Sequence, residues 1–97
     1  MRVTELPIAL VVFGMDGCPA CSSYLTLFRP IAKRHDDVPA FAIDSSLEQN
    51  AAAADHYGIT VTPTTILMKY GKQIQRFEGE GSRADIEKLF RYAEKNR

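Results

Sequence analysis

An unbroken apolar run, Ile8–Phe13, lies near the start of this 97-residue chain and limits the folds that the chain can adopt. The run is short and rich in β-branched residues, which is typical of a strand buried on both faces of a parallel or mixed sheet. It is also far shorter than the roughly 20 apolar residues that a transmembrane helix needs. We therefore expect a central strand of an α/β domain and no contact with a membrane.

One domain is expected to occupy residues 1–97, since a unit below about 50 residues seldom holds its own core. Hydrophobic residues make up 45% of the sequence and charged residues 25%, as in ordinary globular proteins. Twelve basic residues balance twelve acidic ones, so no strong field favours a nucleic acid or an anionic membrane. The flanks of the apolar run lack the pattern of a secretion signal, and we expect a cytoplasmic protein.

A long helix is predicted to begin at Pro19, because the fixed φ and missing N–H of proline suit the first position of a helix. Pro30 lies inside this helix and is expected to kink or split it near Arg29. Apolar residues recur at helical spacing and predict a buried stripe that consists of Cys21, Tyr24, Leu25, Phe28 and Ile31.

The middle of the chain predicts a second strand over Val38–Ile43 and a second helix after it. Ser45 and Glu48 have the spacing of a capping box at the start of that helix. Ala51–Ala54 favours helix strongly, and Gly58 can end it in the left-handed conformation.

The last third predicts a hairpin and a final helix. Val61–Lys69 and Lys72–Glu78 are strand-forming and are separated by the tight turn Tyr70-Gly71. Ser82 is the predicted N-cap of the last helix, with Asp85 at capping-box spacing. Its predicted buried face consists of Ile86, Leu89, Phe90 and Ala93. The resulting order, β-α-β-α-β-β-α, predicts a four-stranded mixed sheet with helices on both faces.

Cys18-Pro19-Ala20-Cys21 stands between the first strand and the first long helix. A thiol at a helix N-terminus faces unpaired backbone N–H groups and the positive end of the dipole, both of which lower its pKa. Cys18 is therefore the candidate nucleophile. Residues i and i+3 of a helix have Cα atoms roughly 5 Å apart, a separation that a disulfide bridges, so Cys21 can close onto Cys18.

This arrangement predicts thiol–disulfide exchange in two steps. The Cys18 thiolate attacks a substrate disulfide, and Cys21, shielded on the apolar stripe, attacks the mixed disulfide and releases the reduced product. The reverse reaction would oxidise dithiols. The alternative that the residues leave open is a pair of reduced, inert cysteines packed as small hydrophobic side chains.

A metal site is not expected at these cysteines. Zinc and iron–sulfur sites need about four ligands, and one Cys-x-x-Cys motif supplies two. His35 and His56 could be recruited, but each is surrounded by polar residues and is expected to be solvated at the surface. We expect no metal and no cofactor beyond the redox-active disulfide Cys18–Cys21.

Two motifs in this order, Cys-Pro-Ala-Cys after a buried strand and Thr62-Pro63-Thr64 at the third strand, resemble the thioredoxin superfamily. The resemblance extends from about Ile8 to the C-terminus and implies an α/β, thioredoxin-like fold. It also implies a cis peptide bond before Pro63, beside the active site, and backbone groups of Thr62 that receive an extended substrate. The candidate substrate-binding residues that it implies are Gly17, Pro19, Thr62, Pro63 and Gly81.

The chain departs from the thioredoxin pattern at several positions. Gly17 stands where thioredoxins usually have a tryptophan, and the chain contains no tryptophan. Val12 stands where thioredoxins commonly bury a carboxylate, so the proton of Cys21 must go to water or to another group, for which Asp16 is a candidate. The N-terminal strand and helix that precede the first buried strand of thioredoxins have no counterpart before Ile8.

We therefore expect a cytoplasmic dithiol–disulfide oxidoreductase of electron transport, a monomer that reduces disulfide-containing proteins and is recharged by a flavin-dependent thioredoxin reductase. The nearest alternative is a glutaredoxin that uses glutathione, which the Cys18-Pro19 step resembles. Glutathione is an anion, and the negative charges of Asp16 and Glu80 would repel it. The helix start at Ser82, with Arg83, would instead favour its binding. Two alternatives stay open: a protein-binding module of thioredoxin fold, and a carrier of an iron–sulfur cluster shared by two chains.

Overall fold

The predicted central strand is β1 (Ala9–Gly14), and all of its residues are buried. In the computed structural model, which describes residues 2–97, β1 pairs in parallel with β2 (Ala40–Asp44) and antiparallel with β3 (Thr64–Lys69). β3 pairs antiparallel with β4 (Lys72–Glu78). The order β2-β1-β3-β4 gives the four-stranded mixed sheet that the sequence predicts.

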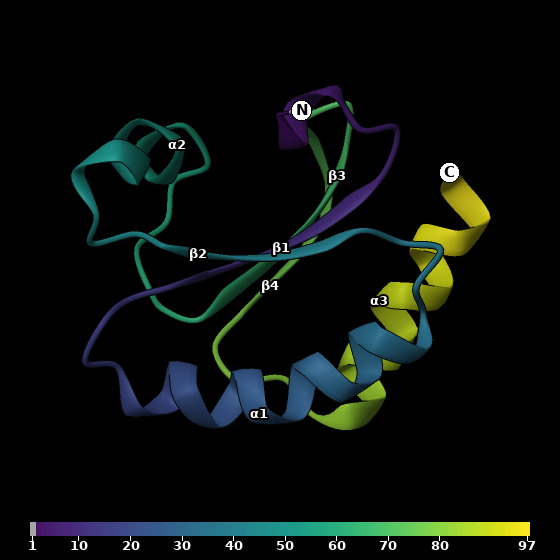
Figure 1. Ribbon diagram of the computed structural model, residues 1–97, viewed down its shortest axis with the longest axis horizontal. Helices are drawn as coiled ribbons and strands as arrows, with labels where there is room; N and C mark the ends of the chain where they lie inside the picture. The colour runs from purple at the N-terminus through teal and green to yellow at the C-terminus, as the bar shows by residue number, and fades with distance from the viewer. Residues whose placement is uncertain (1) are drawn as a thin grey trace.

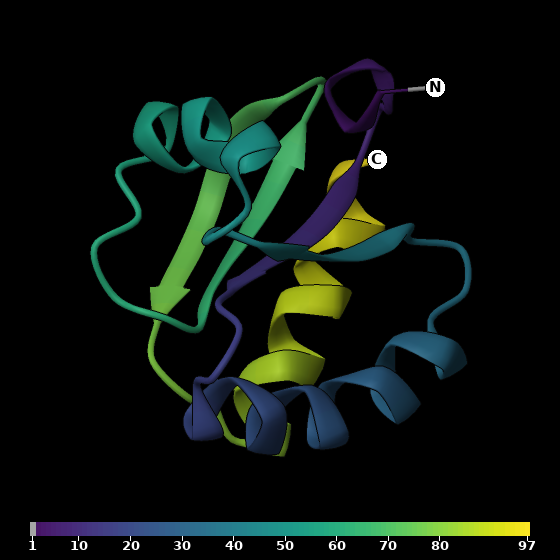
Figure 2. The same cartoon turned by 60° about the vertical axis from the view of Figure 1, so that its left-hand side comes forward.

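Helices lie on both faces of the sheet, as Figure 1 and Figure 2 show. α1 (Pro19–Arg34) and α3 (Arg83–Asn96) cover one face, and the shorter α2 (Ala51–His56) covers the other. Two 3-10 helices, η1 (Val3–Glu5) and η2 (Glu48–Asn50), complete the described elements. None of the helices in residues 2–97 has the length and apolar character needed to cross a bilayer.

The alternation of side chains along β1 divides the interior into two cores. Leu10 and Val12 face α1 and α3, whereas Val11 and Phe13 face α2. The larger core also contains the buried residues Ile8, Tyr24, Phe28, Ile31, Val38, Leu67, Ile86, Leu89, Phe90 and Ala93. The predicted buried faces of both long helices are thus confirmed, with Leu25 only partly buried.

α1 is not split at Pro30, and its helical hydrogen bonding continues to Arg34. The ribbon changes direction in the second half of the helix in Figure 1, in line with the expected kink. The helix stays in one piece because its apolar side chains before and after Pro30, Phe28 and Ile31, are buried in the same core.

The predicted capping box between Ser45 and Glu48 does not form. β2 extends to Asp44, so the backbone N–H of Ser45 donates to the carbonyl of Gly14 at 2.8 Å instead of opening a helix. The carboxylate of Asp44 accepts the backbone N–H of Ser46 at 2.9 Å. The residues that the pattern assigned to a helix cap therefore close the end of the sheet.

The other turn and cap predictions are confirmed. Gly58, after α2, has a left-handed φ of 61°, and the hairpin turn has positive φ at Tyr70 (50°) and Gly71 (80°), as a type I′ turn requires. At the start of α3, the Ser82 side chain accepts the backbone N–H of Asp85 at 3.2 Å, and the Asp85 carboxylate accepts the N–H of Ser82 at 2.8 Å.

The two edges of the sheet differ in character. β4 carries charged residues at Lys72, Arg76 and Glu78, and a bulge interrupts its pairing with β3. β2 has one charged residue, Asp44 at its end, and Phe41 near its start is 38% exposed. Charges and bulges protect an edge strand from pairing with other chains, so the β4 edge has more of this protection than the β2 edge.

Candidate active site

The two cysteines form a disulfide at the N-terminus of α1. Their Cα atoms are 5.2 Å apart, as expected for positions i and i+3 at a helix start. Cys18 is the N-cap residue, and its Sγ accepts the backbone N–H of Cys21 at 3.1 Å. After reduction this N–H and the helix dipole favour the thiolate form of Cys18 over the thiol.

The two sulfurs differ in accessibility. Cys18 is half-buried, whereas Cys21 is 3% exposed and packs beneath the helix start. Cys18 is therefore the more accessible of the two cysteines. This asymmetry agrees with the prediction that Cys18 attacks and Cys21 resolves.

The loop before β3 lies against Cys18. The Oγ1 of Thr62 is 3.7 Å from the Cys18 Sγ, and the Thr62 carbonyl oxygen is 3.9 Å from the same sulfur. The Thr62–Pro63 peptide bond is cis and Pro63 is buried, so β3 begins at Thr64 and not at Val61 as the pattern suggested. The expected cis bond and its position beside the active site are both found.

Asp44 fixes the loop that precedes Cys18, a role that the sequence analysis missed. Its Oδ1 accepts the backbone N–H of Asp16 at 3.3 Å. Hydrogen bonds from the hydroxyl and the N–H of Ser46, more than the one from Asp16, lower the pKa of Asp44. The available signal was topological: Asp44 ends a strand that runs parallel to β1, and the carboxyl ends of neighbouring parallel strands carry binding sites.

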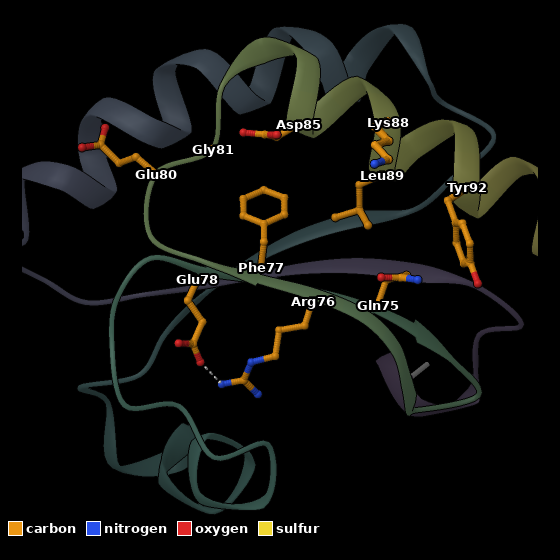
Figure 3. Close-up of a pocket in the computed structure, with 10 residues that line it drawn as sticks. All are labelled: Gln75, Arg76, Phe77, Glu78, Glu80, Gly81, Asp85, Lys88, Leu89 and Tyr92. Atoms are coloured by element: carbon orange, nitrogen blue, oxygen red, sulfur yellow. Dashed lines mark hydrogen bonds and ion pairs between the residues drawn. The ribbon is translucent and has the colours of Figure 1, made fainter.

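Gly17 and Pro19 flank Cys18 and are exposed, and Gly17 has a left-handed φ of 77°. Gly81 lies elsewhere, in a cleft of about 450 Å³ between β4 and α3. Figure 3 shows the Phe77 ring pointing into this cleft toward α3, and a Cβ on Gly81 would come within 2.5 Å of that ring. Neither cysteine lines this cleft, and the binding roles of Gly17, Pro19 and Gly81 stay predictions.

Among residues 2–97, no carboxylate is buried near the second cysteine, where thioredoxins commonly bury one. Val12 is fully buried, and its neighbour across the sheet is Thr65. The Thr65 hydroxyl is paired with the Tyr24 hydroxyl at 2.8 Å. Burial raises the pKa of Tyr24 to about 12, so this phenol stays protonated and cannot accept a proton from Cys21.

His35 is not a solvated surface histidine. Its side chain is 18% exposed and lies between Glu87 and Glu94, which bond its two ring nitrogens at 2.6 and 2.9 Å. The sequence could not show this, because α3 brings both carboxylates from more than fifty residues away. His56 is exposed, as expected. Among residues 2–97, no group of three or more histidine, cysteine or acidic side chains is arranged to hold a metal.

Comparisons with known proteins agree with this geometry. The family model of the thioredoxin-like domain matches residues 2–94. A thioredoxin-like protein of Fusarium culmorum is 36% identical over 67 residues, which cover 67% of this chain and 54% of that protein. Thioredoxin H5 of Arabidopsis thaliana is 28% identical over 85 residues, covering 88% of this chain and 70% of that protein.

Solved structures show the same fold. The thioredoxin of Fasciola hepatica superposes with a TM-score of 0.79 at 24% identity, covering 93% of this chain and 84% of that one. The thioredoxin NaTrxh of Nicotiana alata gives a TM-score of 0.80 at 23% identity, covering 93% and 76%. With the family match over nearly the whole chain and the disulfide at the start of α1, the protein belongs to the thioredoxin superfamily as a thiol–disulfide oxidoreductase.

Proposed function

We propose that the protein reduces disulfides of other proteins through the dithiol form of Cys18-Pro19-Ala20-Cys21. The observation that carries this proposal is the unequal exposure of the two sulfurs at one helix N-terminus. Cys18 is accessible and has the N–H of Cys21 directed at its sulfur at 3.1 Å, which suits a nucleophile. Cys21 is covered, which suits a thiol that reacts only within the complex.

In the first step the Cys18 thiolate attacks a substrate disulfide, and one substrate sulfur leaves as a thiolate. Thr62 lies beside the reacting sulfur, and as part of this proposal its backbone receives an extended substrate segment. In the second step the Cys21 thiolate attacks Cys18, which closes the Cys18–Cys21 disulfide and releases the other substrate thiolate. The protein loses two electrons and the substrate gains them.

We further propose that a flavin-dependent thioredoxin reductase, and not glutathione, recharges the dithiol. The start of α3 is the helix N-terminus that could receive a carboxylate of glutathione. Asp85 already occupies it, because its carboxylate accepts the N–H of Ser82, and this hydrogen bond holds the pKa of Asp85 below its usual range. As part of the same proposal, the protein works as a monomer in the cytoplasm, where dithiols are kept reduced.

The roles of the cysteines are tested by serine variants in an assay of protein disulfide reduction. Cys18→Ser is expected to abolish turnover, because no other accessible thiol exists in the chain. Cys21→Ser is expected to accumulate a mixed disulfide with the substrate, visible as a mass increase that dithiothreitol removes. A mixed disulfide on Cys18→Ser and not on Cys21→Ser would reverse the two roles.

The source of electrons is tested by supplying NADPH with thioredoxin reductase in one series and with glutathione and its reductase in another. Each exposed acidic side chain that repels glutathione weakens its binding by about 0.2–1 kcal/mol. We therefore expect turnover with thioredoxin reductase to be faster by up to roughly tenfold. Asp85→Asn should narrow the preference, since it removes the carboxylate from the start of α3. Faster wild-type turnover in the glutathione series would place the protein among the glutaredoxins.

A further inference from the structure

The second step of the proposed reaction needs a proton acceptor for Cys21. The Cys21 side chain is 3% exposed, and the buried residues near it supply no base. Val12 is apolar, and the Tyr24 hydroxyl is held by Thr65 and keeps its proton. The proton of Cys21 must therefore leave by another direction.

A cleft of about 260 Å³ opens beside Cys21, between α1 and the end of β2. Gly14 forms part of its wall, and a Cβ at position 14 would lie 3.6 Å from the Cys21 Sγ and 4.0 Å from the Ile43 carbonyl oxygen. The space beside the sulfur exists because this position has no side chain. Ala42, on the exposed edge strand, lines the same cleft.

Three charged side chains line the cleft, from the loop, from α1 and from β2: Asp16, Arg29 and Asp44. Asp44 is a poor proton acceptor, because the hydrogen bonds that its Oδ1 accepts, mainly those from Ser46 and also one from Asp16, hold the pKa of its carboxyl below the usual range. Asp16 and Arg29 are exposed, so charged groups border the cleft where it meets solvent.

We infer that this cleft admits the base that deprotonates Cys21, and that the base is water or a small neutral buffer molecule from solvent. The inference rests on the proposed function. The base takes the proton from the Cys21 thiol, the thiolate sulfur bonds to the Cys18 sulfur, and the bond from Cys18 to the substrate sulfur breaks. Its electron pair leaves on the substrate thiolate, which takes a proton from solvent.

The test follows the two steps separately. Reduced protein is mixed rapidly with one equivalent of dithiobisnitrobenzoate, which releases one coloured thiolate when Cys18 attacks and a second when Cys21 resolves. Imidazole, a small base, is varied at fixed pH and ionic strength. The second phase is expected to accelerate in proportion to imidazole, by roughly tenfold over the accessible range, within the contributions typical of general base catalysis. The first phase should not change.

Two variants fill the cleft from opposite sides. Gly14→Ala places a methyl group at ordinary contact distance from the Cys21 sulfur, and Ala42→Leu fills the wall formed by β2. In both, the second phase is expected to slow and to lose most of its imidazole dependence. Ala52→Leu, at an exposed alanine on α2, is the matched control and should behave as wild type.

The outcomes separate the inference from the proposed function. Absence of the first phase would contradict the proposed function itself. Two phases with no imidazole dependence of the second in wild type would overturn the inference, since an internal group would then take the proton. Loss of the second phase in Asp16→Asn would also overturn it and would identify Asp16 as that group, whereas an unchanged dependence in Asp16→Asn supports it.

Discussion

Tyr24 and Thr65 place two hydroxyl groups in the interior directly between α1 and β3. Each hydroxyl satisfies the other, so neither is left unpaired where water cannot reach. The Tyr24 ring also contacts Phe28 and Phe77, with centroids 5.8 and 6.1 Å away. The residue therefore joins the active-site helix to the sheet by both polar and aromatic contacts.

Tyr24→Phe is expected to lower the free energy of unfolding by about 1–2 kcal/mol, because the Thr65 hydroxyl is left buried without a partner. The double variant Tyr24→Phe with Thr65→Val should lose less than the sum of the single variants, since it leaves no unpaired group. Denaturant unfolding of the oxidised proteins measures all three. Strict additivity would mean that the two hydroxyls do not depend on each other.

At the scale of elements, His35 joins the end of α1 to α3. Its ring stacks on Phe90 with centroids 4.9 Å apart, and its nitrogens face Glu87 and Glu94. Glu87 also pairs with Arg34 at 2.7 Å. A ring that bonds carboxylates with both nitrogens needs both of its protons, and the contact is therefore made by the imidazolium form.

The hydrogen bond that the His35 ring donates to the Glu94 carboxylate is the main cause that raises the pKa of His35 above its usual value of 6.5. A raised pKa in the folded state gives stability that is complete below the unfolded value and is lost as pH rises through the folded value. The hydrogen bond with His35 lowers the pKa of Glu87 below its usual value of 4.5. The stability that the Glu87 carboxylate contributes is therefore lost as pH falls through this lowered pKa. The contact is thus strongest between these two pKa ranges.

His35→Gln is expected to lower the free energy of unfolding by about 1–2 kcal/mol near pH 5.5 and by less near pH 9, because wild type loses the imidazolium as pH rises through its raised pKa. Denaturant unfolding across this range measures the difference. His56→Gln, at an exposed histidine on α2, is the matched control and should change neither value. A cost of His35→Gln that is the same at both pH values would show that stacking on Phe90, and not charge, makes the contact.

At the scale of the whole molecule, the sequence predicted what local chemistry determines. The faces of α1 and α3, the capping box at Ser82 and the turn at Tyr70-Gly71 all depend on residues within a few positions of one another. The pair of cysteines was equally predictable, because its chemistry depends on a strand followed at once by a helix start.

The contacts that the sequence could not predict join distant segments. His35 meets Glu87 and Glu94 only because α1 and α3 pack side by side, since the partners are 52 and 59 positions apart in the sequence. Asp44 reaches the active-site loop only because β2 runs parallel to β1. The same strand pairing explains why Ser45 does not cap a helix as predicted. Such pairings depend on the angle and register of packed elements, which periodicity does not encode.

The less protected edge of the sheet determines how the protein behaves when it is concentrated. β2 presents Phe41 and unshielded backbone groups to other molecules, and the formal net charge of the chain is zero, so little repulsion keeps two copies apart. Phe41→Lys is expected to raise the protein concentration at which light scattering begins, whereas Gln75→Lys, which adds the same charge on the already charged β4 edge, should raise it much less. An equal effect of both would point to net charge alone. If Phe41→Lys alone has the effect, colloidal solubility is set at the β2 edge, by a side chain that does not line the cleft beside Cys21.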